Sequence, residues 1–323
     1  MSRPKFATAG VITVLILGGV VAFVMLNYQS IMDQLNAVTY QSTPEMDAIE
    51  NSLELTDQGK HLFHASHPAL EGQTEFNEHC DSHNTEVAVL GCYTDRNIYI
   101  YNAKQSELTG VTETTAAHEL LHAVWERLSS DDKNHLGSLL NDYYNRNRDQ
   151  FGDEMSLYDA DQRMDELHSR IGTEGKNLPQ ELSDHYANYF INQANIVSFY
   201  DSYNNRFKNL KAETERLYEE ITDLESTITV KTAEYKQRTE TLSSNIAEFN
   251  NCANTPDCFT NQSVFNARRS ELLTEQQELE QMYNEINQAI ATYNNKIQEY
   301  NNSIFRTQTL QDSINSNSKP PSV

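Results

Sequence analysis

The C-terminal part of the chain restricts the fold most. From about residue 195 to residue 319 it contains no glycine and a single proline, Pro256. Apolar residues recur there at heptad spacing in two runs, 207–249 and 265–304, and this spacing is typical of long helices that pack along a seam. The first run is Phe207, Leu210, Leu217, Ile221, Leu224, Ile228, Tyr235, Leu242 and Phe249, with polar Thr214, Lys231, Arg238 and Asn245 in the remaining seam positions. The second run is Phe265, Leu272, Leu279, Tyr283, Ile286, Ile290, Tyr293, Ile297, Tyr300 and Ile304.

The two runs have nearly equal lengths, and at 1.5 Å per residue each helix would be about 60 Å long. Between them lies a short polar stretch, "NNCANTPDCFTNQS". We therefore predict an antiparallel coiled-coil hairpin over residues 196–312, closed at its tip by a Cys252–Cys258 disulfide, and a disordered tail at 313–323. The alternative is a pair of parallel helices in a homodimer, which is less economical because the chain would have to run back.

The N-terminal segment 7–26, "ATAGVITVLILGGVVAFVML", carries no charge, and its 20 residues are enough to span a bilayer as a helix. Arg3 and Lys5 precede it, and the next charged residue is Asp33. The positive-inside rule then predicts a cytoplasmic tail at 1–6, a transmembrane anchor at 7–26, a neck at 27–39 and an extracytoplasmic remainder. The alternative is a cleaved signal peptide, but the apolar run is long for one and no clear cleavage site follows.

Charge and cysteine content agree with an extracytoplasmic location. The formal net charge is −23, and such an acidic chain repels phosphates, so we expect no nucleic-acid binding. The four cysteines lie in two close pairs, Cys80 with Cys92 and Cys252 with Cys258, which fits disulfides in an oxidising compartment. The sequence also permits the other pairing, which would join distant regions.

Residues 40–195 read as a mainly helical domain with a small β-sheet. Thr43–Pro44 and Thr56 are expected to start helices. The stretch 86–102, "EVAVLGCYTDRNIYIYN", predicts a hairpin of "VAVL" and "IYIY" around the turn "TDRN". Helices are expected from about 115 to 128 with a cap at Thr112 or Thr114, from 130 to about 144, from 159 to 170 with a stop at Gly172, and from Pro179 through "ELSDHYANYF".

The helix predicted at 115–128 holds two histidines four residues apart, His118 and His122, with Glu119 directly after the first. Residues at this spacing lie on one face of a helix, so both imidazoles would point to one place. Glu119 is displaced by about 100° and would reach a metal-bound water rather than the metal. All the residues of 115–124 apart from these three are uncharged, as expected for a buried helix that carries a metal.

The stretch "TAAHELLHAV" resembles the active-site helix of the zincin metallopeptidases, and residues 85–192 as a whole weakly resemble small bacterial membrane-anchored metallopeptidases. The resemblance implies one Zn²⁺ held by His118 and His122, with Glu119 as general base. A catalytic zinc needs a third protein ligand, and the third histidine of metzincins is absent here. The gluzincin pattern instead implies a glutamate from a later helix, for which we choose Glu166; the alternatives are Glu174 and His168.

Several other residues are candidates for supporting roles. His185 and Tyr186 could stabilise an oxyanion or, like His168, lie behind the ligands, although a surface histidine and a packed tyrosine are the simpler interpretation. The strand "NIYIYN" is either a sheet edge that pairs with an extended peptide or a covered strand. A second histidine set, His61, His64 and His67, has no acid at useful spacing and is expected to be peripheral.

These features predict a membrane-anchored, extracytoplasmic zinc metallopeptidase whose substrate is a peptide or protein. The coiled-coil hairpin would hold the enzyme off the membrane, bind a protein partner or cover the active site. The alternative is an envelope scaffold whose working part is the hairpin and whose zinc site is structural or vestigial. Glu119 favours the enzyme, because a purely structural site does not need an acid there.

Overall fold

The computed structural model describes residues 25, 27–80, 89–103, 108–152, 155 and 158–316. The chain divides into two compact units, one formed by residues 1–206 and 310–323 and the other by residues 207–309. The predicted anchor at 7–26 lies outside the described residues except for Met25. Within the described part of the chain, no helix combines the length and the hydropathy needed to cross a bilayer.

The first unit begins with three helices, α2 (Tyr28–Thr39), α3 (Pro44–Leu53) and α4 (Asp57–Ala65). The expected starts of α3 and α4 are confirmed: Thr43 accepts a hydrogen bond from the Met46 amide, and Thr56 accepts one from the Gly59 amide. The segment predicted as a neck is not isolated from the unit, because α2 packs against α4 and Asp33 of α2 is buried.

A three-stranded sheet follows, with β1 (Ala69–Glu71), β2 (Gly91–Thr94) and β3 (Asn97–Tyr101) in the order β1-β3-β2. The predicted hairpin is confirmed as the antiparallel β2–β3 pair, but its first strand starts at Gly91 and not within "VAVL". The reason is the two-residue turn at Asp95 and Arg96, both at positive φ, which pairs Thr94 with Asn97 and so sets the register. The strand "NIYIY" is the covered one, since β3 pairs with β1 on one side and β2 on the other.

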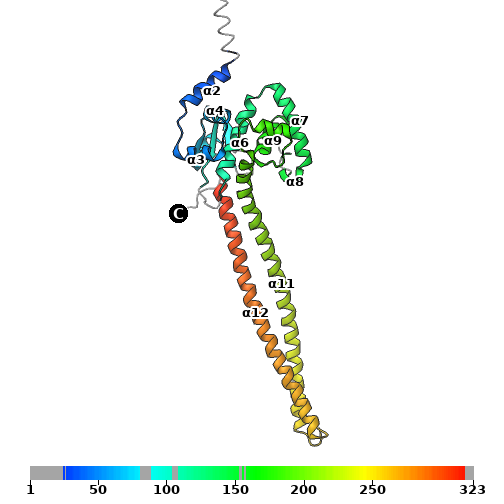
Figure 1. The fold of residues 1–323 in the computed structure, drawn as a ribbon. Helices are drawn as coiled ribbons and strands as arrows, with labels where there is room; N and C mark the ends of the chain where they lie inside the picture. Colours follow the sequence, from blue (N-terminus) through cyan, green and yellow to red (C-terminus); the bar gives the residue numbers. More distant parts are fainter. Residues whose placement is uncertain are drawn as a thin grey trace, which may run out of the picture. The chain divides into compact units, whose positions relative to one another are not determined.

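The remaining elements of this unit are helical: α5 (Gln73–His79), α6 (Val111–Arg127), α7 (Ser130–Arg146), α8 (Arg148–Phe151), α9 (Ala160–Glu174) and α10 (Gln180–Tyr186). Helix α6 lies in the middle and contacts α3, α4, α9, β2 and β3 (Figure 1). Its uncharged residues supply much of the core, as the sequence predicted. Helix α10 ends at Tyr186, earlier than expected, and Phe190 beyond it bridges to Leu55 instead.

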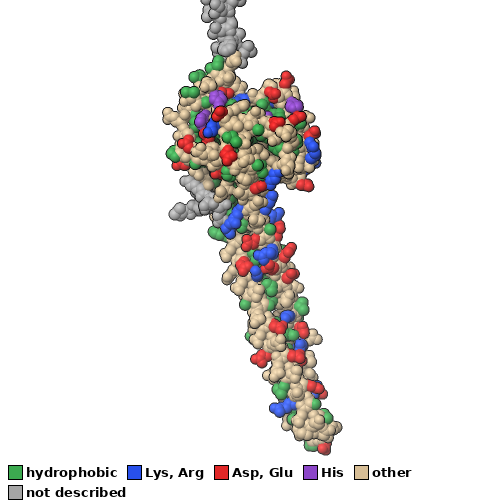
Figure 2. Space-filling model, in the orientation of Figure 1, with side chains coloured by type: hydrophobic (Ala, Val, Ile, Leu, Met, Phe, Trp, Pro, Cys, Tyr) green, Lys and Arg blue, Asp and Glu red, His purple; other side chains and the backbone are tan. Residues whose placement is uncertain are grey.

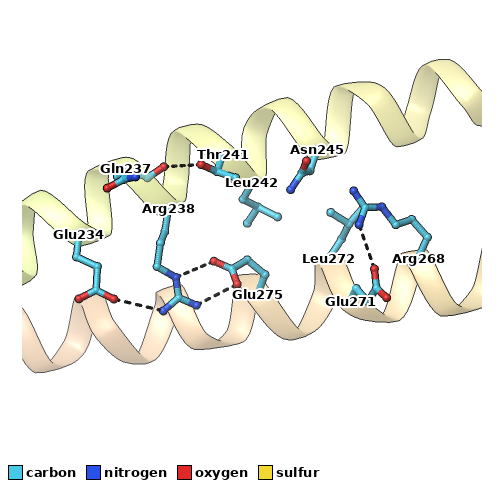
Figure 3. Close-up of a pocket in the computed structure, with 10 residues that line it drawn as sticks. All are labelled: Glu234, Gln237, Arg238, Thr241, Leu242, Asn245, Arg268, Glu271, Leu272 and Glu275. Carbon is cyan, nitrogen blue, oxygen red and sulfur yellow. Dashed lines mark hydrogen bonds and ion pairs between the residues drawn. The ribbon is translucent and has the colours of Figure 1, made fainter.

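The two long helices are α11 (Gln193–Ala253) and α12 (Gln262–Ile314). Between residues 207 and 309 they lie side by side and antiparallel, since contacts join Thr214 to Ser303 near one end and the Phe249 ring to the Phe265 ring near the other. The polar seam positions make cross-helix contacts: Lys231 pairs with Glu285, and Arg238 pairs with Glu275 and Glu278. Figure 3 shows Arg238 reaching from α11 to Glu275 across a shallow groove between the helices.

Both expected disulfides are present, Cys80–Cys92 and Cys252–Cys258. The second closes the tip of the helical pair, where the rings of Phe249, Phe259 and Phe265 pack together. Acidic and basic side chains are interspersed along the pair (Figure 2). Such a surface is typical of solvated paired helices with a narrow apolar seam.

Candidate metal centre

Helix α6 presents the two histidines from the interior of the first unit. It begins at Val111, not near Thr115 as predicted, and its N-cap is Gly110 at φ 95° rather than a threonine. A β-carbon on Gly110 would lie 2.5 Å from the Phe199 carbonyl oxygen of α11. Only glycine can adopt this conformation and also tolerate this close approach. The backbone of α11 at Phe199 therefore limits where α6 can begin.

Helix α9 crosses α6 closely enough to bring a third side chain to the histidines. It runs unbroken through Gly172, where we expected a stop. A β-carbon on Gly172 would lie 2.3 Å from Leu121 of α6 and 2.6 Å from Tyr186 of α10. This glycine therefore permits tight helix packing instead of ending the helix.

Three donor atoms converge where the helices cross. The Nε2 atoms of His118 and His122 are 3.1 Å apart. Glu166 Oε2 lies 3.7 Å from the first and 3.6 Å from the second. The three side chains are 15–21% exposed, so the group is neither sealed in the core nor fully solvated. Within the described residues, this is the one group of histidine, cysteine and acidic side chains close enough to hold a metal ion.

The spacing of these atoms fits a zinc ion. Tetrahedral bonds of 2.0–2.1 Å place neighbouring ligand atoms roughly 3.3 Å apart. The three distances of 3.1, 3.6 and 3.7 Å between the donor atoms bracket that spacing. Two imidazole nitrogens and one carboxylate oxygen also form a donor set that suits zinc and leaves a fourth position for water.

Asp165, next to Glu166, orients one of the histidines. His122 Nδ1 donates a hydrogen bond to Asp165 Oδ1 over 2.7 Å, which leaves the Nε2 lone pair directed at the other two donors. Burial opposes charge on His122, but this bond and the nearby carboxylates raise its pKa to about 9. Burial also opposes charge on Glu166, but His118 and His122 lower its pKa to about 2. The carboxylates around the two histidines therefore favour positive charge at this point, and a bound metal cation would also supply it.

Glu119 is buried, with 5% of its surface exposed, and it lies against the start of strand β2. A β-carbon on Gly91 would come within 2.7 Å of Glu119 Oε1, so the β2 backbone passes directly over this carboxyl group. Burial raises the pKa of Glu119, while His122 and His118 oppose the shift. A carboxyl group with a raised pKa next to two candidate metal ligands is suited to accept and return a proton.

The alternative third ligands lie elsewhere. Glu174 is eight residues beyond Glu166 on the same helix, about 12 Å along its axis. Its carboxylate forms a two-point ion pair with Arg170. His168 is fully buried, packs against Trp125, and places its Nε2 2.8 Å from His185 Nε2. The structure thus brings Glu166, and neither alternative, to the histidine pair.

Tyr186 is a packed core residue, which is the simpler of the two interpretations of the sequence. Its side chain is fully buried, and its hydroxyl group donates to the His168 carbonyl oxygen over 2.8 Å. The hydroxyl hydrogen of Tyr186 therefore already takes part in a hydrogen bond within the core. His185 contacts His168, Tyr186 and Tyr189, and burial lowers its pKa to about 4, so it is neutral at pH 7.

The second histidine set has separate partners and forms no cluster within the described residues. His64 Nε2 lies 2.6 Å from a Glu50 carboxylate oxygen, and His67 Nε2 donates to the Asn36 carbonyl oxygen. Glu50 is an acid that the sequence interpretation did not connect to this set. These contacts join helices to one another, as expected for histidines outside the functional site.

Two residues of the site were not predicted, Asp165 and Gly91. Asp165 had a signal in the sequence, because an acid beside a candidate ligand on one helix can reach the neighbouring histidine. Gly91 had none, since its role depends on β2 passing over α6.

Comparison with known proteins gives no further assignment: no protein-family model matches the chain, and no match was found among curated proteins or solved structures.

Proposed function

We propose that the chain is a membrane-anchored, extracytoplasmic zinc metallopeptidase in which His118, His122 and Glu166 hold the metal and Glu119 is the general base. The observation that carries the proposal is the convergence of three suitable donor atoms, from two histidines and one glutamate, beside a second, buried carboxyl group. A structural zinc site would need the three donors but not that acid.

A zinc ion bound there would lower the pKa of its water toward about 7 and polarise the carbonyl group of the substrate. Glu119 would accept a proton from the attacking water and later deliver it to the nitrogen of the departing amine, so that the peptide C–N bond is replaced by a C–O bond and an N–H bond. A raised pKa makes Glu119 a stronger base for the first step and keeps the proton on the group until the second.

Strand β2 offers a place for an extended substrate. Within the described residues it pairs only with β3, which leaves its other edge open for backbone hydrogen bonds. Gly91 at the start of β2 lies against Glu119, so a peptide on this edge would run past the general base. The proposed edge strand for a peptide is therefore β2 and not the strand "NIYIYN".

Two disulfides support the extracytoplasmic side of the membrane, because such bonds persist in oxidising compartments. The uncharged segment 7–26 supports an anchor with a cytoplasmic N-terminus. The long helical pair would serve as a spacer or bind a protein partner.

The test compares the wild-type full chain, reconstituted in lipid, with Glu119→Gln, Glu166→Gln and the control Glu113→Gln. Glu113 lies in the first turn of the same helix. Zinc content is measured by mass spectrometry, and activity is measured against a peptide library. We expect Glu119→Gln to keep one zinc and lose at least about 100-fold in rate. Glu166→Gln should lose zinc, and Glu113→Gln should change neither.

Equal zinc in the wild type and Glu119→Gln, with no cleavage by either, would instead support the scaffold role with a structural zinc. Absence of zinc from the wild type would rule out the site itself.

A further inference from the structure

Helix α2 has its polar and apolar faces reversed relative to an ordinary surface helix. Gln29, Asp33 and Asn36 follow one another at helical spacing and point into the first unit. Asp33 is 5% exposed and accepts hydrogen bonds from Arg96 and Arg127, at 2.8–3.0 Å. Asn36 donates from its side chain to the Ala65 carbonyl oxygen. The polar face of α2 is thus fixed to α4, α6 and the β2–β3 turn.

The opposite face of α2 exposes large apolar side chains next to the uncharged polar residues Ser30, Gln34 and Thr39. Tyr28, Leu35 and Val38 are 55–76% exposed and lie on one side of the helix, and hydrophobic side chains are visible there in Figure 2. Water-soluble helices normally bury this face and expose the other. Because Asp33 fixes the orientation, α2 cannot turn its apolar side inward without leaving a charge unpaired.

This face also lacks charge, in a chain whose net charge is −23. Between Lys5 and Glu45 the sequence contains a single charged residue, Asp33, and that carboxylate is neutralised inside the unit. The apolar segment 7–26 ends directly before α2, so whatever surrounds that segment lies next to this face.

We propose that the apolar face of α2 rests in the interface of a lipid bilayer. Apolar and aromatic side chains on one side of a helix, without acidic groups, are suited to the boundary between headgroups and acyl chains. The helix then acts as a second membrane contact after the anchor, and through Asp33 and Arg127 it holds the end of α6 close to the membrane. This interaction goes beyond peptide hydrolysis and does not depend on it.

The experiment places a tryptophan on this face of the full chain in phosphatidylcholine vesicles. Leu35→Trp and Val38→Trp are made separately, and Asp142→Trp, at an exposed position on α7, is the control. Emission is compared between ordinary lipids and lipids with brominated acyl chains, after subtraction of the wild-type signal from Trp125. We expect bromine to quench both α2 variants at least about twofold and to leave the control unchanged.

Three outcomes would overturn the proposal. Emission typical of exposed indole, unaffected by bromine, would show that the face is in water. Emission shielded from water but not quenched, together with cross-linking between chains, would assign the face to a second copy. Failure of the wild-type chain to float with the vesicles would remove the membrane contact altogether. Metal content and cleavage activity do not enter the readout, so the result is independent of the proposed enzyme.

Discussion

Asp165 contacts the proposed metal centre through a hydrogen bond to His122 Nδ1. Carboxylate partners of this kind fix the tautomer of a histidine ligand and increase its basicity, and their loss typically costs 10–100-fold in metal affinity. We predict that Asp165→Asn weakens zinc binding by about 10–100-fold, measured by competition with a chelator of known affinity. The exposed acid Asp142 provides the matched control, Asp142→Asn, which should bind zinc as the wild type does. Unchanged affinity in Asp165→Asn would mean that the bond is incidental.

The half-buried histidine His185 gives the first unit a defined sensitivity to acid. Burial lowers its pKa from 6.5 to about 4, so between these pH values the unfolded chain binds more protons than the folded chain. The free energy of unfolding should therefore fall as the pH falls through this window, by at most on the order of 3 kcal/mol from this residue. We predict that His185→Gln flattens this dependence in urea titrations with a chelator present. His135→Gln, at a 68% exposed side chain, should keep the wild-type slope.

At the scale of elements, the crossing of α6 and α9 determines whether the centre forms. Adding a methyl group at Gly172 would place it 2.3 Å from Leu121 and 2.6 Å from Tyr186, both within the core. We predict that Gly172→Ala lowers the free energy of unfolding by about 1–3 kcal/mol and weakens zinc binding, because α9 must move away and take Glu166 with it.

Gly137 offers the matched control, since it also lies inside a helix but its nearest neighbour to an added β-carbon is Met164 Sδ at 3.7 Å. Gly137→Ala should leave zinc binding unchanged and stabilise the helix by up to about 1 kcal/mol. Chemical denaturation and zinc titration on the same samples check both variants. Equal effects of the two substitutions would show that space at the crossing is not the limiting factor.

The sequence predicted those elements whose signals are local and missed those set by a distant neighbour. The two histidines and Glu119 share one helix, so their spacing alone places them, and the heptads of α11 and α12 likewise lie within single helices. Gly172 was predicted to end its helix. Its actual role is to leave room for Leu121, which lies 51 positions earlier in the chain and so gives no local signal. The start of α6 at Gly110 depends in the same way on the backbone at Phe199. Strand order, which makes β2 the open edge, is also non-local.

Over the whole molecule, the two disulfides lie in different compact units and should have separable effects. Cys80–Cys92 links the end of α5 to β2, and β2 carries Gly91 against Glu119. Cys252–Cys258 closes the tip of the helical pair. Loop lengths predict a loss of about 3 kcal/mol for removal of the first bond and about 2 kcal/mol for removal of the second.

We predict that replacing both cysteines of the first pair with serine lowers the unfolding free energy and also the cleavage rate, because β2 is released beside the general base. The same replacement of the second pair should change the stability of the helical pair while zinc content and cleavage stay at wild-type values. Thermal unfolding, zinc analysis and peptide cleavage on the two double variants check this. If loss of the tip disulfide reduced cleavage as much as loss of the first, the proposal that the first unit alone carries the reaction would be wrong.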